Sequence, residues 1–421
     1  MNILLILLGK ILSKLINLLN LGSGATWPGH IALNLNPKFV SEILGNSKAK
    51  IILVAGTNGK TTTSQLIQTI LSGNGKRAFS NTSGANLLNG IASSIILNSN
   101  IFGRLNYDFA AFEVDEYTLP LALKEFTPSY LVLLNLFRDQ LDRYGEINTI
   151  SLKWKSAIDK LPKSTKLILN ANDPQIAFLG VGKSSLYFGL EEKGNKNIPN
   201  NADSVFCPKC SSPLFFSDIY FSHIGNWVCP KCKFKRPKIN LYESPYYPLP
   251  GTYNKFNILA AVLFAKLNNL SNEVIEQSLR TFKPAFGRQE EIRSNGKKIK
   301  IFLSKNPTSF NESLRTIKKA KTILLVLNDR IPDGRDISWI WDIDFENLLK
   351  ASKVIVSGDR SYDLGIRLKY ANFNKFRVFD ELSKAIKFAL RETQENETLY
   401  VLPTYSAMLE VREILTGRKI K

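Results

Sequence analysis

A glycine-rich segment that ends in lysine and threonine carries the clearest chemical signal in this chain. Glycines allow backbone N–H groups to converge on phosphate oxygens, and the following lysine supplies positive charge to the β- and γ-phosphates. The hydroxyl of the next threonine is suited to a bound Mg²⁺. The candidate ATP contacts of this segment are Gly56, Thr57, Asn58, Gly59, Lys60, Thr61 and Thr62. The order of residue types predicts an ATP-binding loop rather than an ordinary glycine turn.

All four cysteines lie in two copies of Cys-Pro-Lys-Cys, which residues 211–228 separate. Four thiolates at this spacing form a closed tetrahedral zinc site, so a structural zinc ribbon is predicted over about 202–238. The ligands are Cys207, Cys210, Cys229 and Cys232. Nucleic-acid binding is the alternative role, because aromatic side chains of a ribbon can stack on bases. Those aromatics are Phe215, Phe216, Tyr220, Phe221 and Trp227.

No cysteine remains as a nucleophile, and the chain has only two histidines, His30 and His223. A self-contained Cys-His-Asp site therefore cannot be built from this chain. Any reaction that needs ammonia released from glutamine by such a site requires a second protein.

The phosphate-binding loop must be positioned by the elements around it. An apolar run at 51–54 precedes it and a segment with helical apolar spacing at 64–71 follows it. Further short apolar strands at 109–114, 130–135 and 166–170 predict a parallel sheet covered by helices. Ligands gather at the carboxyl ends of such strands. The polar residues expected there are Glu113, Asp115, Glu116, Asn135, Asp139, Asp142, Asn170 and Asp173.

Apolar runs at 321–328, 353–358 and 398–403 predict a second, smaller α/β domain. The expected fold class is α/β, with a central phosphate-loop ATPase domain at 46–290 that contains the inserted four-cysteine zinc ribbon. A Rossmann-like α/β domain follows at 291–421, and residues 1–45 form an N-terminal amphipathic helix and lead-in. With 421 residues the chain is long enough for this organisation.

The formal net charge of +20 favours anionic partners such as nucleotides, nucleic acid or acidic lipid headgroups, unless it reflects a lysine- and asparagine-rich genome. The first 22 residues are rich in leucine, and their polar residues fall close to one helical face. This pattern predicts an amphipathic helix that lies on a membrane surface or a partner, or that covers the protein's own core. The apolar stretch before Lys10 is too short to span a bilayer.

Several motifs in this order resemble the Mur ligase family, which joins amino acids to cell-wall precursors through acyl-phosphates. They are the loop at 56–62, Phe-Glu-Val-Asp at 112–115, the block at 135–142, Asn-Ala-Asn-Asp at 170–173, Gly-Thr-Tyr-Asn at 251–254 and Phe-Gly-Arg at 286–288. The resemblance implies that Thr61 and Glu113 hold Mg²⁺ and that Lys60 and Arg288 act in catalysis. It also implies nucleotide-binding roles for Glu113, Asn135, Asp139, Asn254, Asn257 and Arg288, the last as the arginine that reaches the ATP phosphates.

The departures from the family pattern are informative. About 50 residues precede the phosphate loop, too few for the family's domain that binds a uridine nucleotide. Gln140 stands where the family has a Mg²⁺-binding histidine, and Lys305 displaces an aspartate after the arginine. The number of Mg²⁺ ions is therefore left open.

One branch of the family has these same departures, and the chain resembles it at 137–146, 305–307 and 333–339. The resemblance implies the synthetase subunit of a heterodimer with a class I glutaminase (GatD-like). ATP would activate the α-carboxyl of D-glutamate in the lipid II stem peptide, and amidation would give D-isoglutamine. Asp336 is expected to complete the glutaminase's Cys-His pair; the fallback residues are Asp333, Asp342 and Asp344.

The same resemblance implies a cytoplasmic protein at the inner face of the cytoplasmic membrane that does not bind nucleic acid. Two other functions remain open at this point. One is a stand-alone ligase that adds an amino acid, and the other is a zinc-ribbon ATPase that binds nucleic acid.

Overall fold

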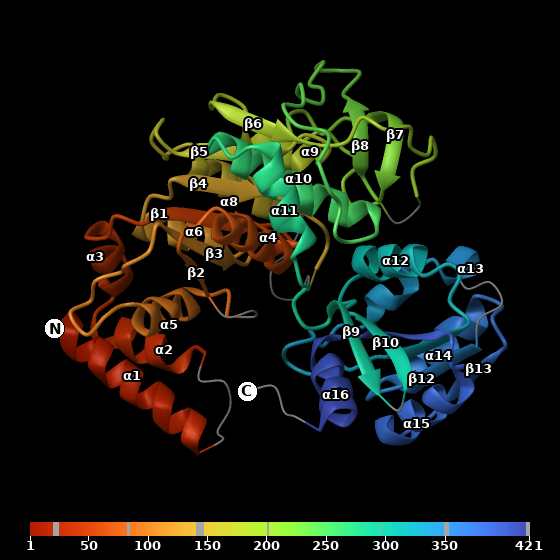
Figure 1. Ribbon diagram of the computed structural model, residues 1–421. Helices are drawn as coiled ribbons and strands as arrows, with labels where there is room; N and C mark the ends of the chain where they lie inside the picture. Colours follow the sequence, from red (N-terminus) through yellow and green to blue (C-terminus); the bar gives the residue numbers. More distant parts are fainter. Residues whose placement is uncertain are drawn as a thin grey trace.

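The structure is a computed structural model that describes residues 1–19, 25–81, 85–139, 147–199, 202–294, 296–348 and 353–417. The predictions for Gln140 and Asp142 concern residues outside these ranges. Figure 1 shows two α/β units side by side, with a group of N-terminal helices next to the first unit and a small hairpin at its other edge. The predicted α/β fold class is confirmed.

The central sheet has six parallel strands in the order β2-β3-β1-β4-β5-β6. Because β1 lies between β3 and β4, the loop after β1 and the residues after its two neighbours meet at one sheet edge. The strands are β1 (Lys50–Ala55), β2 (Ala78–Ser80), β3 (Phe109–Val114), β4 (Tyr130–Leu133), β5 (Lys166–Asn170) and β6 (Ser185–Phe188).

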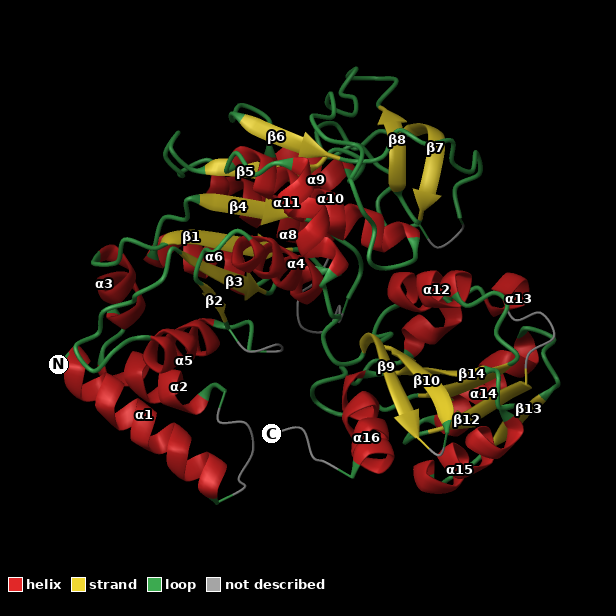
Figure 2. Cartoon of the chain, in the orientation of Figure 1, coloured by secondary structure: helices red, strands yellow, loops and turns green. Residues whose placement is uncertain are grey.

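Alternate residues of β1 enter two separate cores. Ile51 and Leu53 pack under α5, α6, α8 and α9, whereas Ile52 and Val54 pack under α4, α10 and α11 (Figure 2). Both faces of the sheet are therefore buried, as parallel sheets require. The helices are α4 (Lys60–Gly73), α5 (Leu88–Asn98), α6 (Thr118–Glu125), α8 (Ile147–Ile158), α9 (Pro174–Leu179), α10 (Thr252–Leu267) and α11 (Asn272–Arg280).

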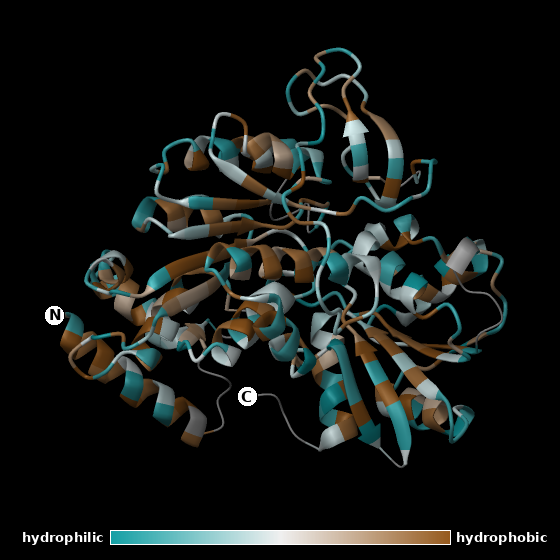
Figure 3. Cartoon of the chain, turned by 45° about the horizontal axis from the view of Figure 1, so that its top comes forward, coloured by the Kyte–Doolittle hydropathy of each residue, from teal (hydrophilic) through white to brown (hydrophobic). Residues whose placement is uncertain are grey.

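Three N-terminal helices pack beside this sheet: α1 (Asn2–Leu18), α2 (Trp27–Leu35) and α3 (Phe39–Gly45). Leu5 and Ile6 of α1 are buried in the core, so the helix covers its own protein. The polar face expected toward solvent lies partly against the protein instead: Ser13 is 7% exposed and Lys10 donates to the Leu97 carbonyl at 3.2 Å. Apolar residues occupy much of the exposed face (Figure 3).

An antiparallel hairpin of β7 (Phe215–Phe221) and β8 (Ile224–Val228) forms the predicted insert. Its small core contains Cys207 and Cys229 together with Leu214, Phe216, Ile219 and Trp227. Because Phe216 and Trp227 are buried in this small core, they are not placed to stack on the bases of a nucleic acid, which argues against the nucleic-acid role.

The second sheet has the order β13-β12-β11-β14-β10-β9, and only β9 runs antiparallel to its neighbour. Its first strand begins at Arg288. The strands are β9 (Arg288–Ser294), β10 (Lys297–Phe302), β11 (Thr322–Val326), β12 (Lys353–Ser357), β13 (Phe376–Val378) and β14 (Thr398–Pro403). The helices are α12 (Pro307–Thr316), the 3₁₀ helix η1 (Ser338–Asp342), α13 (Phe345–Leu348), α14 (Ser361–Tyr370), α15 (Leu382–Glu392) and α16 (Tyr405–Thr416).

Candidate active site

The glycine loop turns the chain from β1 into α4. Gly56 and Gly59 have φ angles of +143° and +92°, which disfavour any side chain. A Cβ at residue 59 would also lie 2.1 Å from Oδ1 of Asn257 on α10. Glycine is therefore required here both for its backbone conformation and for the close approach of α10.

Lys60, the first residue of α4, points back into the loop. Its ammonium donates to the carbonyls of Gly56 at 2.6 Å and Thr57 at 3.2 Å, and Glu116 lies 3.8 Å away. Burial alone would raise the pKa of Glu116, but Lys60, Lys305 and a hydrogen bond from Thr57 outweigh burial and lower it. An ionised carboxylate thus balances the charge of the lysine at the base of the loop.

The two predicted Mg²⁺ ligands lie together. The hydroxyl of Thr61 donates to Oε2 of Glu113, at the end of β3, over 2.6 Å. Magnesium prefers oxygen ligands in compact octahedral geometry, and two oxygens this close can serve one ion. The residues present therefore fit a Mg²⁺ ion bound between α4 and β3.

Asn135, just beyond β4, fixes the shape of the loop. Its side-chain oxygen accepts from the backbone N–H of Asn58 at 2.9 Å, and its amide donates to the carbonyl of Asn58 at 3.0 Å. Its own carbonyl accepts from the N–H of Thr57. Asn135 therefore acts on the loop that is expected to hold phosphate, as well as lining the adjacent cavity.

An open cavity of about 840 Å³ lies between the two α/β domains beside this loop. It is lined by seven residues predicted to contact nucleotide: Asn58, Gly59, Thr62, Asn135, Asn254, Asn257 and Arg288. Asn257 donates to Asn254 over 3.3 Å. Burial lowers the pKa of Arg288, and the nearby Glu113 opposes this effect.

Asp139 has a partner that sequence reasoning missed. Its carboxylate forms a salt bridge with Lys305 of the second domain. Burial raises the pKa of Asp139, and the charge of Lys305 only partly opposes this effect. Burial would lower the pKa of Lys305, but the negative charges of Asp139 and Glu116 outweigh burial and raise it. The side chains of Asn58 and Asn306 also meet, at 3.2 Å, across the same domain boundary. Polar contacts therefore join the phosphate loop region to the start of α12.

Glu312 on α12 is a second residue that carried no sequence signal. It is buried at the wall of the cavity and accepts from Arg315 at 2.7 Å. Burial raises its pKa to about 7, although Arg315 opposes the increase. A carboxyl group that titrates near neutrality thus faces the same cavity as Arg288.

The aspartates of the C-terminal motif differ in accessibility. Asp336 is exposed, and its carboxylate accepts from the N–H of Ser338 at 2.8 Å, which is the local capping contact expected of an aspartate in this position. Asp333 is buried and accepts from the N–H and hydroxyl of Ser406. Asp342 pairs with Arg138 at 3.2 Å, and the N–H of Asp344 donates to Asn311. The side chain of Asp336 is therefore accessible to another protein, whereas that of Asp333 is not.

A second cavity, of about 520 Å³, connects this motif with the first domain. Asp336, Asp333 and Asp342 line it, and so do Asp139 and Lys305. Lys305 also lines the cavity beside the phosphate loop. The exposed aspartate and the candidate ATP site therefore border adjoining spaces.

The four cysteines form one cluster. Their sulfur atoms lie within 4.8 Å of one another, with 3.5 Å between Cys207 and Cys232 and between Cys210 and Cys229. Tetrahedral zinc with Zn–S bonds of about 2.3 Å separates its sulfurs by about 3.8 Å. The cluster fits a zinc ion, which would stabilise the ribbon and leave no position open for chemistry.

Known proteins share this sequence and fold. Residues 54–265 match the family model of the Mur ligase middle domain, and residues 303–408 match that of the MurT ligase C-terminal domain. The chain is 31% identical to the MurT subunit of lipid II isoglutaminyl synthase (glutamine-hydrolyzing) from Streptococcus pneumoniae, over 95% of this chain and 94% of that protein. Identity to the MurT subunit from Staphylococcus aureus strain COL is 33%, over 93% of each.

Solved structures share the fold at lower identity. A pseudomurein peptide ligase type C from Methanothermus fervidus has a TM-score of 0.69 and 23% identity, over 92% of this chain and 84% of that one. The MurF ligase from Thermotoga maritima in complex with ADP has a TM-score of 0.57 and 16% identity, over 90% and 82%. The family models and the MurT relatives go further than the fold: this chain is an ATP-dependent ligase that belongs to the Mur ligase family, in its MurT branch.

Proposed function

We propose that this chain is the synthetase subunit of a glutamine-dependent amidotransferase. In this proposal it transfers the γ-phosphoryl group of ATP to the α-carboxylate of D-glutamate in the stem peptide of lipid II. Ammonia then attacks the acyl-phosphate, inorganic phosphate leaves, and the product is D-isoglutamine. A class I glutaminase subunit supplies the ammonia, since the chain has no cysteine outside its zinc cluster.

The residues around the loop suit the phosphoryl-transfer step. Lys60 and Arg288 are cations at the loop and in the cavity, where they would stabilise negative charge on the transferring group. The loop N–H groups bind the remaining phosphate oxygens, and Asn135 holds the loop in its shape. Mg²⁺ between Thr61 and Glu113 would neutralise phosphate charge when bound.

One observation carries the amidation proposal beyond ATP binding. The exposed Asp336 lines a cavity together with Lys305, which also lines the candidate ATP cavity. An aspartate that orients a histidine in a Cys-His glutaminase must face the partner, and the exposure of Asp336 allows this. Ammonia released beside Asp336 would be formed next to the site of carboxylate activation.

The test is ATP-dependent amidation of a lipid-linked muropeptide, read by mass spectrometry, with either ammonium or glutamine and with or without the glutaminase. We expect amidation with ammonium by this chain alone and with glutamine only when the partner is present. Asp336→Asn should abolish the glutamine reaction and retain the ammonium reaction, whereas Asp342→Asn should retain both. An acceptor that stays unmodified in every arm while ATP is hydrolysed would rule out this substrate.

We also propose that the protein lies on the inner face of the cytoplasmic membrane through α1. Its exposed face carries Leu4, Leu8, Ile11, Leu15 and Leu18, with Lys14 beside them. Residues 1–41 contain no aspartate or glutamate, so the charged side chains of this segment are all positive. An apolar helix face flanked by positive charge suits a membrane surface with anionic lipid. Among the described helices, none is long and apolar enough to cross a bilayer.

Sedimentation with vesicles tests this proposal directly. The Leu8→Glu, Ile11→Glu double variant changes two side chains that are 46% and 55% exposed, so the fold should tolerate it. We expect the parent protein to bind anionic vesicles more strongly than zwitterionic ones, and the variant to bind neither. If the parent and the variant bind vesicles equally, this face has no lipid-binding role. If the variant instead fails to bind the glutaminase, the face is the binding surface for that protein.

A further inference from the structure

The tip of the zinc-ribbon hairpin is buried in the central domain. Phe221, the last residue of β7, is 4% exposed, and His223 and Ile224 are fully buried. The ring of Phe221 lies 5.9 Å from that of Phe137 and 5.8 Å from that of Phe256 on α10. The ribbon is therefore an integral part of the core beneath α10 and not an appendage.

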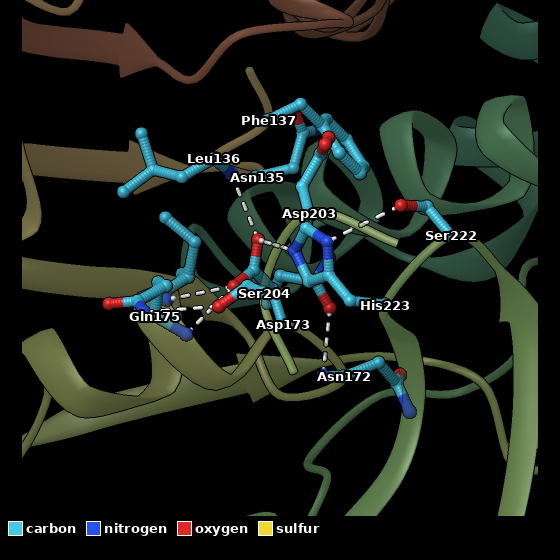
Figure 4. Close-up of polar contacts among 12 residues, drawn as sticks. Asn135, Leu136, Phe137, Asn172, Asp173, Gln175, Asp203, Ser204, Ser222 and His223 are labelled. Carbon is cyan, nitrogen blue, oxygen red and sulfur yellow. Dashed lines mark hydrogen bonds and ion pairs between the residues drawn. The ribbon is translucent and has the colours of Figure 1, made fainter. Parts of the chain in front are cut away.

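A polar network joins this tip to the loop after β4 (Figure 4). The Nε2 atom of His223 lies 3.5 Å from Oδ2 of Asp173, and the same oxygen accepts from the N–H of Leu136 at 2.9 Å. The His223 ring also packs on Phe137, with 4.9 Å between ring centroids. The ribbon thus contacts Phe137 directly and reaches Leu136 through Asp173, the residue before α9.

The same loop segment is attached to the phosphate-binding loop on its other side. The N–H of Phe137 donates to the hydroxyl of Thr57 at 3.0 Å, and the preceding Asn135 bonds both backbone groups of Asn58. The hairpin tip is consequently two contacts away from the residues that are expected to hold phosphate.

The hairpin tip also contributes directly to the cavity. Phe221, Phe137 and Phe256 all belong to its lining, alongside Asn254 and Asn257. An aromatic surface next to amide side chains suits a nucleotide base, which stacks on aromatic rings and hydrogen-bonds through its edge. The phosphate groups would lie at the glycine loop, on the part of the cavity that Asn58 and Gly59 line.

The part of the ribbon that carries the cysteines has only a small apolar core to stabilise it without metal. It consists of a two-stranded hairpin with a small apolar core, in which Cys207 and Cys229 are themselves members. A two-stranded hairpin is marginally stable in water, and structural zinc sites supply the missing folding free energy. Phe221 and His223 lie at the tip of this hairpin, so a metal that stabilises its two strands also supports the position of these side chains.

We propose that the zinc ribbon forms the base-binding wall of the nucleotide cavity, so that zinc binding and nucleotide binding are coupled. The proposal rests on the assignment of this cavity to ATP. Phe221 is a binding residue in it, and His223 is a positioning residue that acts through Asp173 and the loop at 135–137. Because coupling of two ligands is reciprocal, nucleotide must also increase the affinity for zinc by the same factor.

The first experiment uses the zinc-loaded full chain and a fluorescent ATP analogue. Phe221→Ala should weaken nucleotide binding about tenfold, the usual scale for loss of one base-stacking ring, with zinc content unchanged. Phe215→Ala is the matched control, because Phe215 lies on the same strand but is 58% exposed and does not line the cavity. Equal dissociation constants for the two variants would overturn the proposal.

The second experiment measures zinc affinity by competition with a chelating dye at equilibrium, with and without nucleotide, while circular dichroism follows the fold. We expect nucleotide to increase the zinc affinity of the parent chain and to have a smaller effect in Phe221→Ala. A zinc affinity that nucleotide does not alter would also overturn the coupling. If the zinc-loaded parent does not bind the analogue at all, the ATP assignment of the cavity fails instead.

Discussion

Replacing Glu312 by glutamine should change how the stability of the protein depends on pH. The Glu312 carboxyl is buried on α12, and burial raises its pKa from the usual 4.5 to about 7. Glutamine has nearly the same shape and keeps an oxygen that can accept from Arg315. The Glu312→Gln substitution therefore removes the titration with little change in packing.

The sign and size of the effect follow from linkage. As the pH rises above 4.5 the unfolded chain releases this proton, whereas the folded chain keeps it until about pH 7. Across that window the folded state binds more protons, so the free energy of unfolding falls as the pH increases. A shift of this size corresponds to about 3 kcal/mol. Glu312→Gln should therefore gain stability relative to the parent by about 3 kcal/mol from about pH 4.5 to pH 8.

Urea unfolding at a series of pH values measures this difference, and Glu346→Gln is the control. Glu346 lies in the same domain and also pairs with an arginine, but the hydrogen bond from Arg367 lowers its pKa. The control should therefore lose stability relative to the parent above the pKa of this carboxyl. A constant difference between Glu312→Gln and parent at all pH values would show that the buried carboxyl is ionised at neutral pH, contrary to this reasoning.

Three further outcomes follow from the site. Lys60→Met should lower kcat by about 100-fold or more, since a cation at the transferring phosphoryl group is lost, with an unchanged circular dichroism spectrum; normal turnover would exclude the catalytic role. Glu113→Gln should raise the Mg²⁺ concentration needed for half-maximal activity, and an unaltered Mg²⁺ titration would place the ion elsewhere. Cys229→Ser should lose zinc and lower Tm, whereas full zinc content by elemental analysis would contradict a four-cysteine site.

Features that depend on residues close together in the chain could be predicted from the sequence. The glycine loop lies between a strand and a helix, and the spacing of the cysteines matched a cluster, because both depend on nearby residues. The proximity of Thr61 and Glu113 was implied by the resemblance to the Mur ligase family, and the structure explains it, since β1 and β3 are neighbours in a parallel sheet.

Contacts between distant segments were not predictable in the same way. Asp139 was expected at the nucleotide, but nothing in its neighbourhood shows that Lys305 approaches it from another domain. The raised pKa of Glu312 results from burial of its carboxyl group. The sequence of α12 mixes apolar and polar residues and does not indicate that this glutamate is buried. For α1 the pattern predicts an amphipathic helix, but it does not show which side faces the protein: Ser13 is buried, whereas Leu4 and Ile11 are exposed.

The contact between Gly59 and Asn257 has an evolutionary consequence. Any side chain at residue 59 collides with the Asn257 amide, and a smaller residue at 257 would relieve the collision without removing the strain of φ = +92°. No change at position 59, alone or together with a smaller residue at 257, therefore restores the conformation that glycine provides. In a mutational library selected for growth, position 59 should tolerate no replacement alone, and combined changes at 59 and 257 should be recovered no more often than loss-of-function alleles.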